Sequence, residues 1–182
     1  MTRYIILDRD GVINHDSDSF IKSADEWQAI DGSLEAIALL NQHNYKVVVI
    51  TNQSGIARRL FTLETLQAIH DKMQSEVDKA GGKITAIYYC PHGPDDQCQC
   101  RKPKPGLFKQ FAREHGIDLP GIPVIGDSMR DLQAASAVNA KPILVRTGKG
   151  ERIVRQLRTT NIPVYENLYE ASIAIIKSTH FH

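Results

Sequence analysis

The stretch RYIILDRDG, residues 3–11, joins a short β-branched apolar run to two aspartates and a glycine. Two later runs have the same form: KVVVIT at 46–51 ends in Thr51, and IPVIG at 122–126 precedes Asp127. Short apolar runs followed by polar residues predict strands, and KVVVIT, apolar on both faces, predicts a buried strand of a parallel sheet. In such sheets ligands bind beyond the carboxyl ends of the strands. We therefore expect these polar residues to meet in one site.

Amphipathic helical stretches alternate with the strands, which predicts a three-layer α/β fold with a doubly wound, Rossmann-like parallel sheet. Thr62 is a suitable N-cap for one helix, and Gly81-Gly82 end it. No linker, repeat or large cap domain divides the chain, so we expect one domain over residues 1–182. The expected helices cover 32–44, 62–80, 106–116 and 127–138, further strands cover 84–89 and 142–145, and a helix, a short strand at 162–165 and a terminal helix complete the chain.

The composition argues against several classes of function. The 182 residues carry a net charge of +1 and only 7% aromatic residues, so no broad basic surface for nucleic acid is expected. No apolar run approaches the length of a membrane span, and the N-terminus does not resemble a signal peptide, so the expected location is the cytoplasm. We expect a monomer with no nucleic-acid or membrane partner.

The motif DRDG at 8–11 carries the chemistry that the sequence suggests. Residues two apart in a strand share a side, so Asp8 and Asp10 are expected to face one pocket while Arg9 points elsewhere. A divalent cation relieves the repulsion between two close carboxylates, after which one can attack phosphorus while the other carries the proton of the leaving group. A solvated turn after a strand is the alternative interpretation.

Three further segments supply the remaining groups for phosphoryl transfer. In GDSMRD at 126–131, Asp127 can complete an oxygen-rich magnesium shell and Asp131 can hold a metal-bound water, although the two could also cap a helix. TNQSG at 51–55 offers hydroxyl, amide and backbone donors to phosphoryl oxygens, or is merely a turn. In RKPKPG, Lys102 or Lys104 can neutralise the transferring group, and a solvated loop is the preferred interpretation for Lys104.

In this order, DRDG, TN, RKPKPG and GD…D resemble the four motifs of the haloacid dehalogenase (HAD) superfamily phosphatases, over about residues 3–149. The resemblance implies a HAD fold in which Asp8 is the nucleophile that forms an aspartyl-phosphate and Asp10 is the general acid/base. It implies that Thr51 donates to phosphoryl oxygens and that Lys102 steadies nucleophile and phosphate. Catalytic Mg²⁺ is then held by Asp8, Asp10 (through its main chain) and Asp127, with Asp131 acting through water.

The segment CPHGPDDQCQC places three cysteines and a histidine within eleven residues. Cys90, His92, Cys98 and Cys100 match the four-ligand set of structural Zn²⁺ and leave no spare cysteine. We therefore expect a zinc-binding loop insertion at about 90–100 that holds the following Arg101 and Lys102 in place. A transient disulfide, or buried free thiols beside an uninvolved histidine, are the alternatives.

The zinc loop combined with the four motifs resembles HAD members that act on small phosphorylated sugars. The resemblance implies substrate contacts from Arg101 and from the polar stretch at 16–19, which on sequence alone would be interpreted as a surface loop. Histidinol-phosphate phosphatases share these motifs and are the alternative enzyme, and an inactive zinc-stabilised binding module is a more distant one. Helical histidines such as His70 are expected to be solvated. The expected substrate-binding residues are Asp16, Ser17, Asp18, Ser19, Asn52, Gln53, Ser54 and Arg101.

Overall fold

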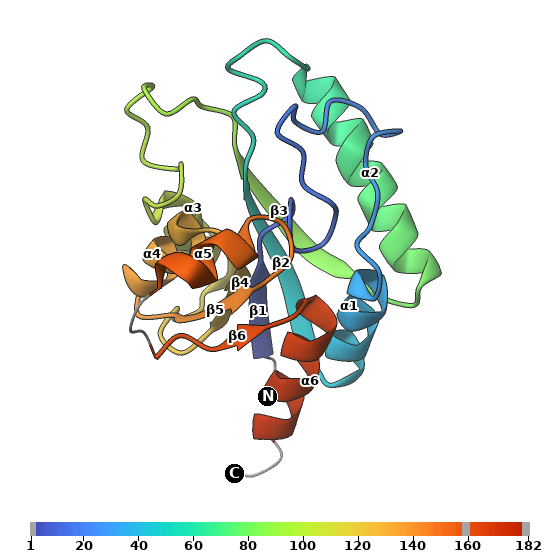
Figure 1. The fold of residues 1–182 in the computed structure, drawn as a ribbon, viewed down its shortest axis with the longest axis vertical. Coiled ribbons are helices and arrows are strands. Elements are labelled where there is room, and N and C mark those ends of the chain that lie inside the picture. The colour runs from blue at the N-terminus through green and yellow to red at the C-terminus, as the bar shows by residue number, and fades with distance from the viewer. Residues whose placement is uncertain (1–2, 158–160, 180–182) are drawn as a thin grey trace.

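The computed structural model describes residues 3–157 and 161–179 and shows a central sheet between two layers of helices (Figure 1). Within these residues, six parallel strands pair in the order β3-β2-β1-β4-β5-β6. This is the strand order of a doubly wound sheet, as predicted. The strands are β1 (Arg3–Leu7), β2 (Tyr45–Asn52), β3 (Ile84–Cys90), β4 (Pro123–Gly126), β5 (Lys141–Val145) and β6 (Val164–Tyr165).

The helices cover both faces of the sheet because successive strand residues point to opposite sides. Ile5 and Leu7 of β1 pack in the core with α1, α2 and α6, whereas Ile6 packs on the other face with α3 and α4 (Figure 1). None of the described helices is long and apolar enough to cross a membrane. The helices are α1 (Ser33–Gln42), α2 (Leu63–Lys79), α3 (Gly106–His115), α4 (Met129–Ser136), α5 (Gly150–Gln156) and α6 (Leu168–Thr179).

The start of α4 differs from the predicted start at residue 127. Ser128 has an extended backbone, with φ −136° and ψ 157°, and is the N-cap. The Oδ2 atom of Asp131 accepts hydrogen bonds from the Ser128 backbone N–H (3.1 Å) and hydroxyl (2.8 Å). The capping interaction therefore begins the helix two residues late and leaves Asp127 outside it, at the end of β4.

The order in which the chain adds strands to the sheet reverses at β1. From β1 the chain proceeds outward through β2 and β3, and then crosses to β4 on the other side of β1. The Asp8 backbone N–H donates to the Ile125 carbonyl of β4 at 3.0 Å. Asp8 and Asp127 thus follow the two adjacent strands at the topological switch point, which is where such sheets bind ligands.

Candidate active site and metal centres

A pocket of about 180 Å³ opens at the carboxyl ends of the central strands. It lies at the switch point between β1 and β4 and extends towards the end of β2 and the loop before α3. Most of its lining is polar or charged. The lining residues are Asp8, Asp10, Asp16, Ser17, Asp18, Phe20, Ile21, Thr51, Asn52, Gln53, Ser54, Arg101, Lys102, Asp127, Ser128, Arg130, Asp131 and Lys149.

Three carboxylates and one ammonium form the base of the pocket. One oxygen from each of Asp8, Asp127 and Asp131 lies within 4.8 Å of the others. The Nζ atom of Lys102, whose side chain is 4% exposed, lies 2.7 Å from Asp131 Oδ1 and 3.1 Å from Asp8 Oδ1. It also donates to the Ile50 carbonyl at 2.7 Å, so all three ammonium hydrogens have acceptors.

The cluster carries more negative than positive charge. Burial and the nearby Asp131 carboxylate raise the pKa of Asp8 to about 7, although Lys102 opposes the shift. Burial and the Asp8 charge raise the pKa of Asp127 to about 8. Burial alone would lower the pKa of Lys102, but Asp131 and Asp8 raise it above its usual value. Burial and the neighbouring carboxylates together thus disfavour the ionised forms of Asp8 and Asp127 more than Lys102 offsets.

Asp10 faces the same pocket in a different electrostatic environment. Its carboxylate accepts hydrogen bonds from the Arg9 guanidinium, from Asn14 Nδ2 (2.8 Å) and from Gln53 Nε2 (3.0 Å). Burial would raise the pKa of Asp10, but the Arg9 charge and these hydrogen bonds hold it below its usual value. As expected, Asp8 and Asp10 line the pocket and Arg9 does not, but the sequence did not indicate that the Arg9 guanidinium would bond the Asp10 carboxylate, because strand alternation ends with β1 at Leu7.

The end of β2 and the residues that follow it connect the pocket to its surroundings. The Asn52 side chain bonds the main chain of Lys102, and Gln53 Nε2 donates both to Asp10 and to Thr51 Oγ1 (2.9 Å). Since Gln53 Oε1 accepts from Arg9 at 3.3 Å, the side-chain donors and acceptor of Gln53 are all engaged within the protein. Ser54 also lines the pocket.

Two glycines allow the chain to approach Asp127. A Cβ atom at Gly11 or Gly148, both with positive φ, would collide with the Asp127 carboxylate. The Lys149 backbone N–H donates to Asp127 Oδ2 at 2.9 Å, and its Nζ lies 3.5 Å from Asp16 Oδ2. The turn after β5 therefore contacts both Asp127, at the base of the pocket, and Asp16, which also lines it.

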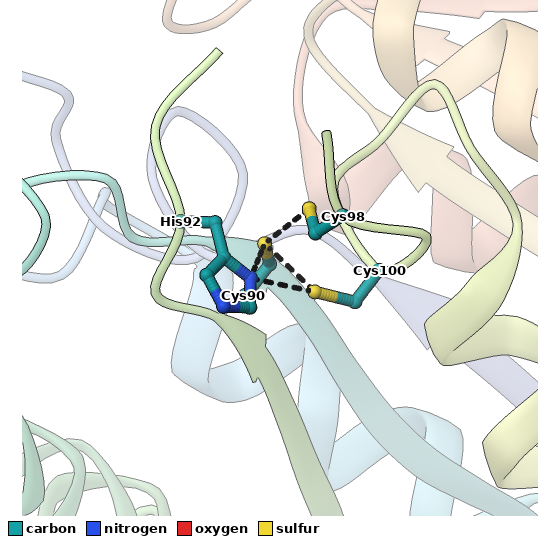
Figure 2. A group of neighbouring side chains, drawn as sticks. All are labelled: Cys90, His92, Cys98 and Cys100. Carbon is teal, nitrogen blue, oxygen red and sulfur yellow. Dashed lines mark hydrogen bonds between the residues drawn. The ribbon is translucent and has the colours of Figure 1, made fainter. Parts of the chain in front are cut away.

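The cysteine-rich loop gathers four potential ligand atoms beside the pocket, and Figure 2 shows them pointing toward one another. The Cys90 sulfur lies 3.7 Å from that of Cys98 and 3.0 Å from that of Cys100, and His92 Nδ1 lies 3.2 Å from the Cys100 sulfur. The three cysteines are free thiols. A tetrahedral site with Zn–S bonds of about 2.3 Å separates its sulfur ligands by roughly 3.7 Å, which the Cys90–Cys98 pair matches, whereas Cys90 and Cys100 lie closer together than such a site requires.

Comparison with known proteins identifies the family. Residues 5–127 match the polynucleotide kinase 3 phosphatase family model, and residues 99–171 match the HAD-hydrolase-like family model. The D-glycero-beta-D-manno-heptose-1,7-bisphosphate 7-phosphatase of Bordetella bronchiseptica is 56% identical, covering 85% of this chain and 86% of its own length. The Pseudomonas aeruginosa protein of the same name is 49% identical, covering 95% and 97%. The chain belongs to the heptose-1,7-bisphosphate 7-phosphatase family of HAD-like phosphatases.

A solved HAD-like phosphatase structure gives the same result for the fold. The crystal structure of D,D-heptose 1,7-bisphosphate phosphatase from B. bronchiseptica, complexed with magnesium and phosphate, superimposes with a TM-score of 0.94 at 50% identity. The superposition covers 97% of this chain and 99% of that one. The prediction of a HAD fold with a cysteine-rich loop and no large cap domain is confirmed.

Within this HAD-like phosphatase, the structure brings most expected site residues to one pocket but not all. Ser19 does not line it, whereas its neighbours Phe20 and Ile21 do. Sequence reasoning missed Arg130 and Lys149. The rule that polar residues follow strand ends would have indicated Lys149, because it lies in the turn after β5. It gives no signal for Phe20 or Ile21, which belong to a long loop.

Proposed function

We propose that this HAD-like phosphatase removes the 7-phosphate of D-glycero-beta-D-manno-heptose 1,7-bisphosphate and forms a phosphorylated intermediate on Asp8. The observation that carries the chemistry is the position of Lys102 Nζ between Asp8 and Asp131 at the base of a polar pocket. The named relatives at 49% and 56% identity support the substrate. The product would then enter heptose synthesis for the bacterial cell envelope.

The acidic cluster fits magnesium. Its donors are carboxylate oxygens, which Mg²⁺ prefers, and burial together with the neighbouring carboxylates raises the pKa values of Asp8 and Asp127, an effect that a bound cation would oppose. The proposed ligands are Asp8, Asp127 and the main chain at Asp10, with Asp131 acting through water. Magnesium bound there would neutralise charge on the transferring phosphoryl group.

In the first half-reaction, a carboxylate oxygen of Asp8 attacks phosphorus. The new Asp8 O–P bond forms as the P–O bond to the sugar breaks, and Asp10 gives its proton to the departing sugar oxygen. The incoming phosphate dianion is a like charge beside Asp10 and raises its pKa toward the range that this step needs. Lys102 and the Thr51 hydroxyl stabilise the charge on the phosphoryl oxygens.

In the second half-reaction, water attacks the phosphorus of the aspartyl-phosphate. Asp10, now ionised, takes a proton from that water, and the Asp8 carboxylate is released with inorganic phosphate. The Arg9, Asn14 and Gln53 donors favour the ionised form that this step requires. Further proposed substrate contacts come from the remaining expected residues that line the pocket: Asp16, Ser17, Asp18, Asn52, Ser54 and Arg101.

We also propose that Cys90, His92, Cys98 and Cys100 hold a structural Zn²⁺. The support is a complete four-ligand set with distances near those of a tetrahedral site, which leaves no open position for catalysis. Cysteines that bind a metal must stay reduced, which suits a reducing compartment, and we propose a cytoplasmic location. We propose that the active protein is a single-domain monomer, whose pocket gathers the proposed nucleophile, acid/base and lysine.

The deciding experiment compares magnesium-dependent kcat/KM for heptose 1,7-bisphosphate, histidinol phosphate and a generic sugar monophosphate. We expect clear preference for the heptose substrate and loss of turnover in Asp8→Asn. A preference for histidinol phosphate would replace the proposed substrate with the alternative. Full activity of Asp8→Asn would contradict the assignment of Asp8 as the nucleophile and would mean that the reaction takes place at another site.

A further inference from the structure

A buried arginine lies directly behind Asp10. The Arg9 side chain is fully buried, with Nε and Nη2 donating to Asp10 Oδ1 at 3.0 and 2.8 Å and Nη2 also reaching Oδ2 at 3.1 Å. Its remaining contacts are Gln53 Oε1 at 3.3 Å and His70 Nε2 at 3.1 Å. Arg9 therefore connects the end of β2 and helix α2 to a carboxylate of the pocket.

The contact with His70 defines the state of that histidine. A guanidinium has only donors, so His70 Nε2 must accept and the ring proton must lie on Nδ1. Burial and the Arg9 charge lower the pKa of His70 to about 3, which is consistent with a neutral ring. The expectation that His70 is solvated is wrong: it is 4% exposed, on the buried side of α2.

The Asp10 carboxylate is held by protein hydrogen bonds and still reaches the pocket. Three hydrogen bonds from Arg9, one from Asn14 and one from Gln53 hold its oxygens, while its side chain remains 23% exposed toward the pocket. Proton transfer to a leaving group requires a carboxylate at a defined position, and a free Asp side chain would rotate. The partners of Asp10 supply this restriction.

We propose that Arg9 is a positioning residue that orients Asp10 for proton transfer, and that His70 of α2 holds the Arg9 guanidinium in place. The proposal rests on the proposed function, since it assigns a role to Arg9 only if Asp10 serves the leaving group. A positioning role differs from a purely structural ion pair in one respect. Loss of the Arg9 interaction must slow the protonation step rather than the whole reaction.

The test uses His70→Leu, which removes the acceptor, and His70→Gln, whose amide oxygen can replace it. The matched control is Gln67→Leu, on the exposed side of α2 one turn earlier. We expect His70→Leu to lower kcat for the sugar phosphate about tenfold, part of the roughly 10²- to 10⁴-fold that acid–base catalysis supplies. KM should change less than about twofold, and His70→Gln should recover most of the lost kcat.

A second substrate separates positioning from general damage. The nitrophenolate of p-nitrophenyl phosphate leaves without a proton, so His70→Leu should release a pre-steady-state burst of nitrophenol at the wild-type rate. A burst slowed as much as the sugar reaction, or no effect on either substrate, would overturn the proposal. If the proposed function itself fails, the wild type shows no magnesium-dependent turnover of either substrate, which is a different result.

A double-mutant cycle decides the matter if His70→Leu does not fold. Arg9→Met is made in the wild type and in Asp10→Asn, and kcat is measured for all four proteins. If Arg9 acts through Asp10, we expect a large effect in the wild type and almost none in Asp10→Asn. Equal effects in both backgrounds would contradict the proposal.

Discussion

The Asn52 side chain forms two hydrogen bonds with the main chain of Lys102, 50 residues away in the sequence. Asn52 Nδ2 donates to the Lys102 carbonyl at 3.1 Å, and the Lys102 N–H donates to Asn52 Oδ1 at 3.0 Å. Asn52 ends β2, whereas Lys102 lies in the loop that precedes α3. This pair therefore fixes the backbone from which the pocket's buried ammonium extends, a role different from the substrate contact proposed for Asn52.

Replacing Asn52 should lower kcat as well as the free energy of unfolding, and the loss of kcat should exceed that of a variant with the same loss of stability. Asn52→Leu removes both hydrogen bonds, so we expect a free energy of unfolding lower by about 1–3 kcal/mol and a kcat lower by about tenfold, since a misplaced cation loses much of its effect. Asn41→Leu is a matched control, because Asn41 bonds the Tyr45 carbonyl and the Lys83 N–H in the same way. Urea unfolding and kcat should show similar destabilisation of both variants but normal turnover only in Asn41→Leu.

Lys102 should matter for stability as well as for catalysis. Lys102→Met leaves Asp8 and Asp131 without their buried partner, which costs about 3–5 kcal/mol in metal-free protein. Because Mg²⁺ compensates part of this charge, we expect the magnesium-induced rise in melting temperature to be larger in the variant than in the wild type. Turnover should fall on the order of 10²- to 10³-fold.

Lys104→Met is the control, since the exposed side chain of Lys104 forms a single hydrogen bond within the described part of the chain, to the Cys98 carbonyl. We expect it to keep nearly normal kcat and an unchanged response to magnesium. Equal losses in the two lysine variants would show that the loop as a whole, rather than the ammonium at Lys102, supports the reaction.

The sequence predicted those residues of the site that lie at or directly after the end of a strand. Asp8, Thr51 and Asp127 follow or end adjacent parallel strands, so topology alone brings them to one edge of the sheet. The hydrogen bonds from Arg9 to Asp10 were not predicted, because both residues lie past Leu7 in a turn, where Gly11 with φ 85° changes the direction of the chain. Such a turn has no fixed period, and its side-chain directions do not follow from spacing.

His70 was missed although a signal existed. The buried residues of α2 follow the helical repeat of one face, and His70 lies among them. Counting an ionisable residue as polar places it on the solvent side, whereas its partner Arg9 becomes visible only when the loop after β1 is placed against α2. Long-range polar pairs of this kind depend on tertiary contacts that periodicity does not encode.

The cysteine-rich loop should couple metal content to activity. Cys98→Ser removes one ligand, and we expect loss of bound zinc, a lower melting temperature and reduced kcat, because Arg101 and Lys102 directly follow Cys100. Metal analysis, thermal melting and kinetics at saturating Mg²⁺ measure these effects. The exposed Asp95, within the same loop, gives the control Asp95→Asn. Zinc-free wild type with unchanged melting temperature and kcat would contradict a structural metal.

His70 should make the protein less stable in acid. Its pKa is about 3 in the folded state, against about 6.5 for an unperturbed histidine. Between these values the unfolded chain binds the proton that the folded chain excludes, so this contribution to stability is complete above pH 6.5 and decreases as the pH falls toward 3. The largest slope from one group is about 1.4 kcal/mol per pH unit.

His70→Gln removes this titration and retains an acceptor for Arg9, so its free energy of unfolding should depend less steeply on pH between 6 and 4 than that of the wild type. Urea unfolding of both proteins at a series of pH values measures the difference. The range above pH 7 is the internal control, because His70 is neutral in both states there and the two slopes should agree. Parallel curves through the acidic range would mean that the ring is protonated in the folded protein, in which case Nε2 could not accept from Arg9.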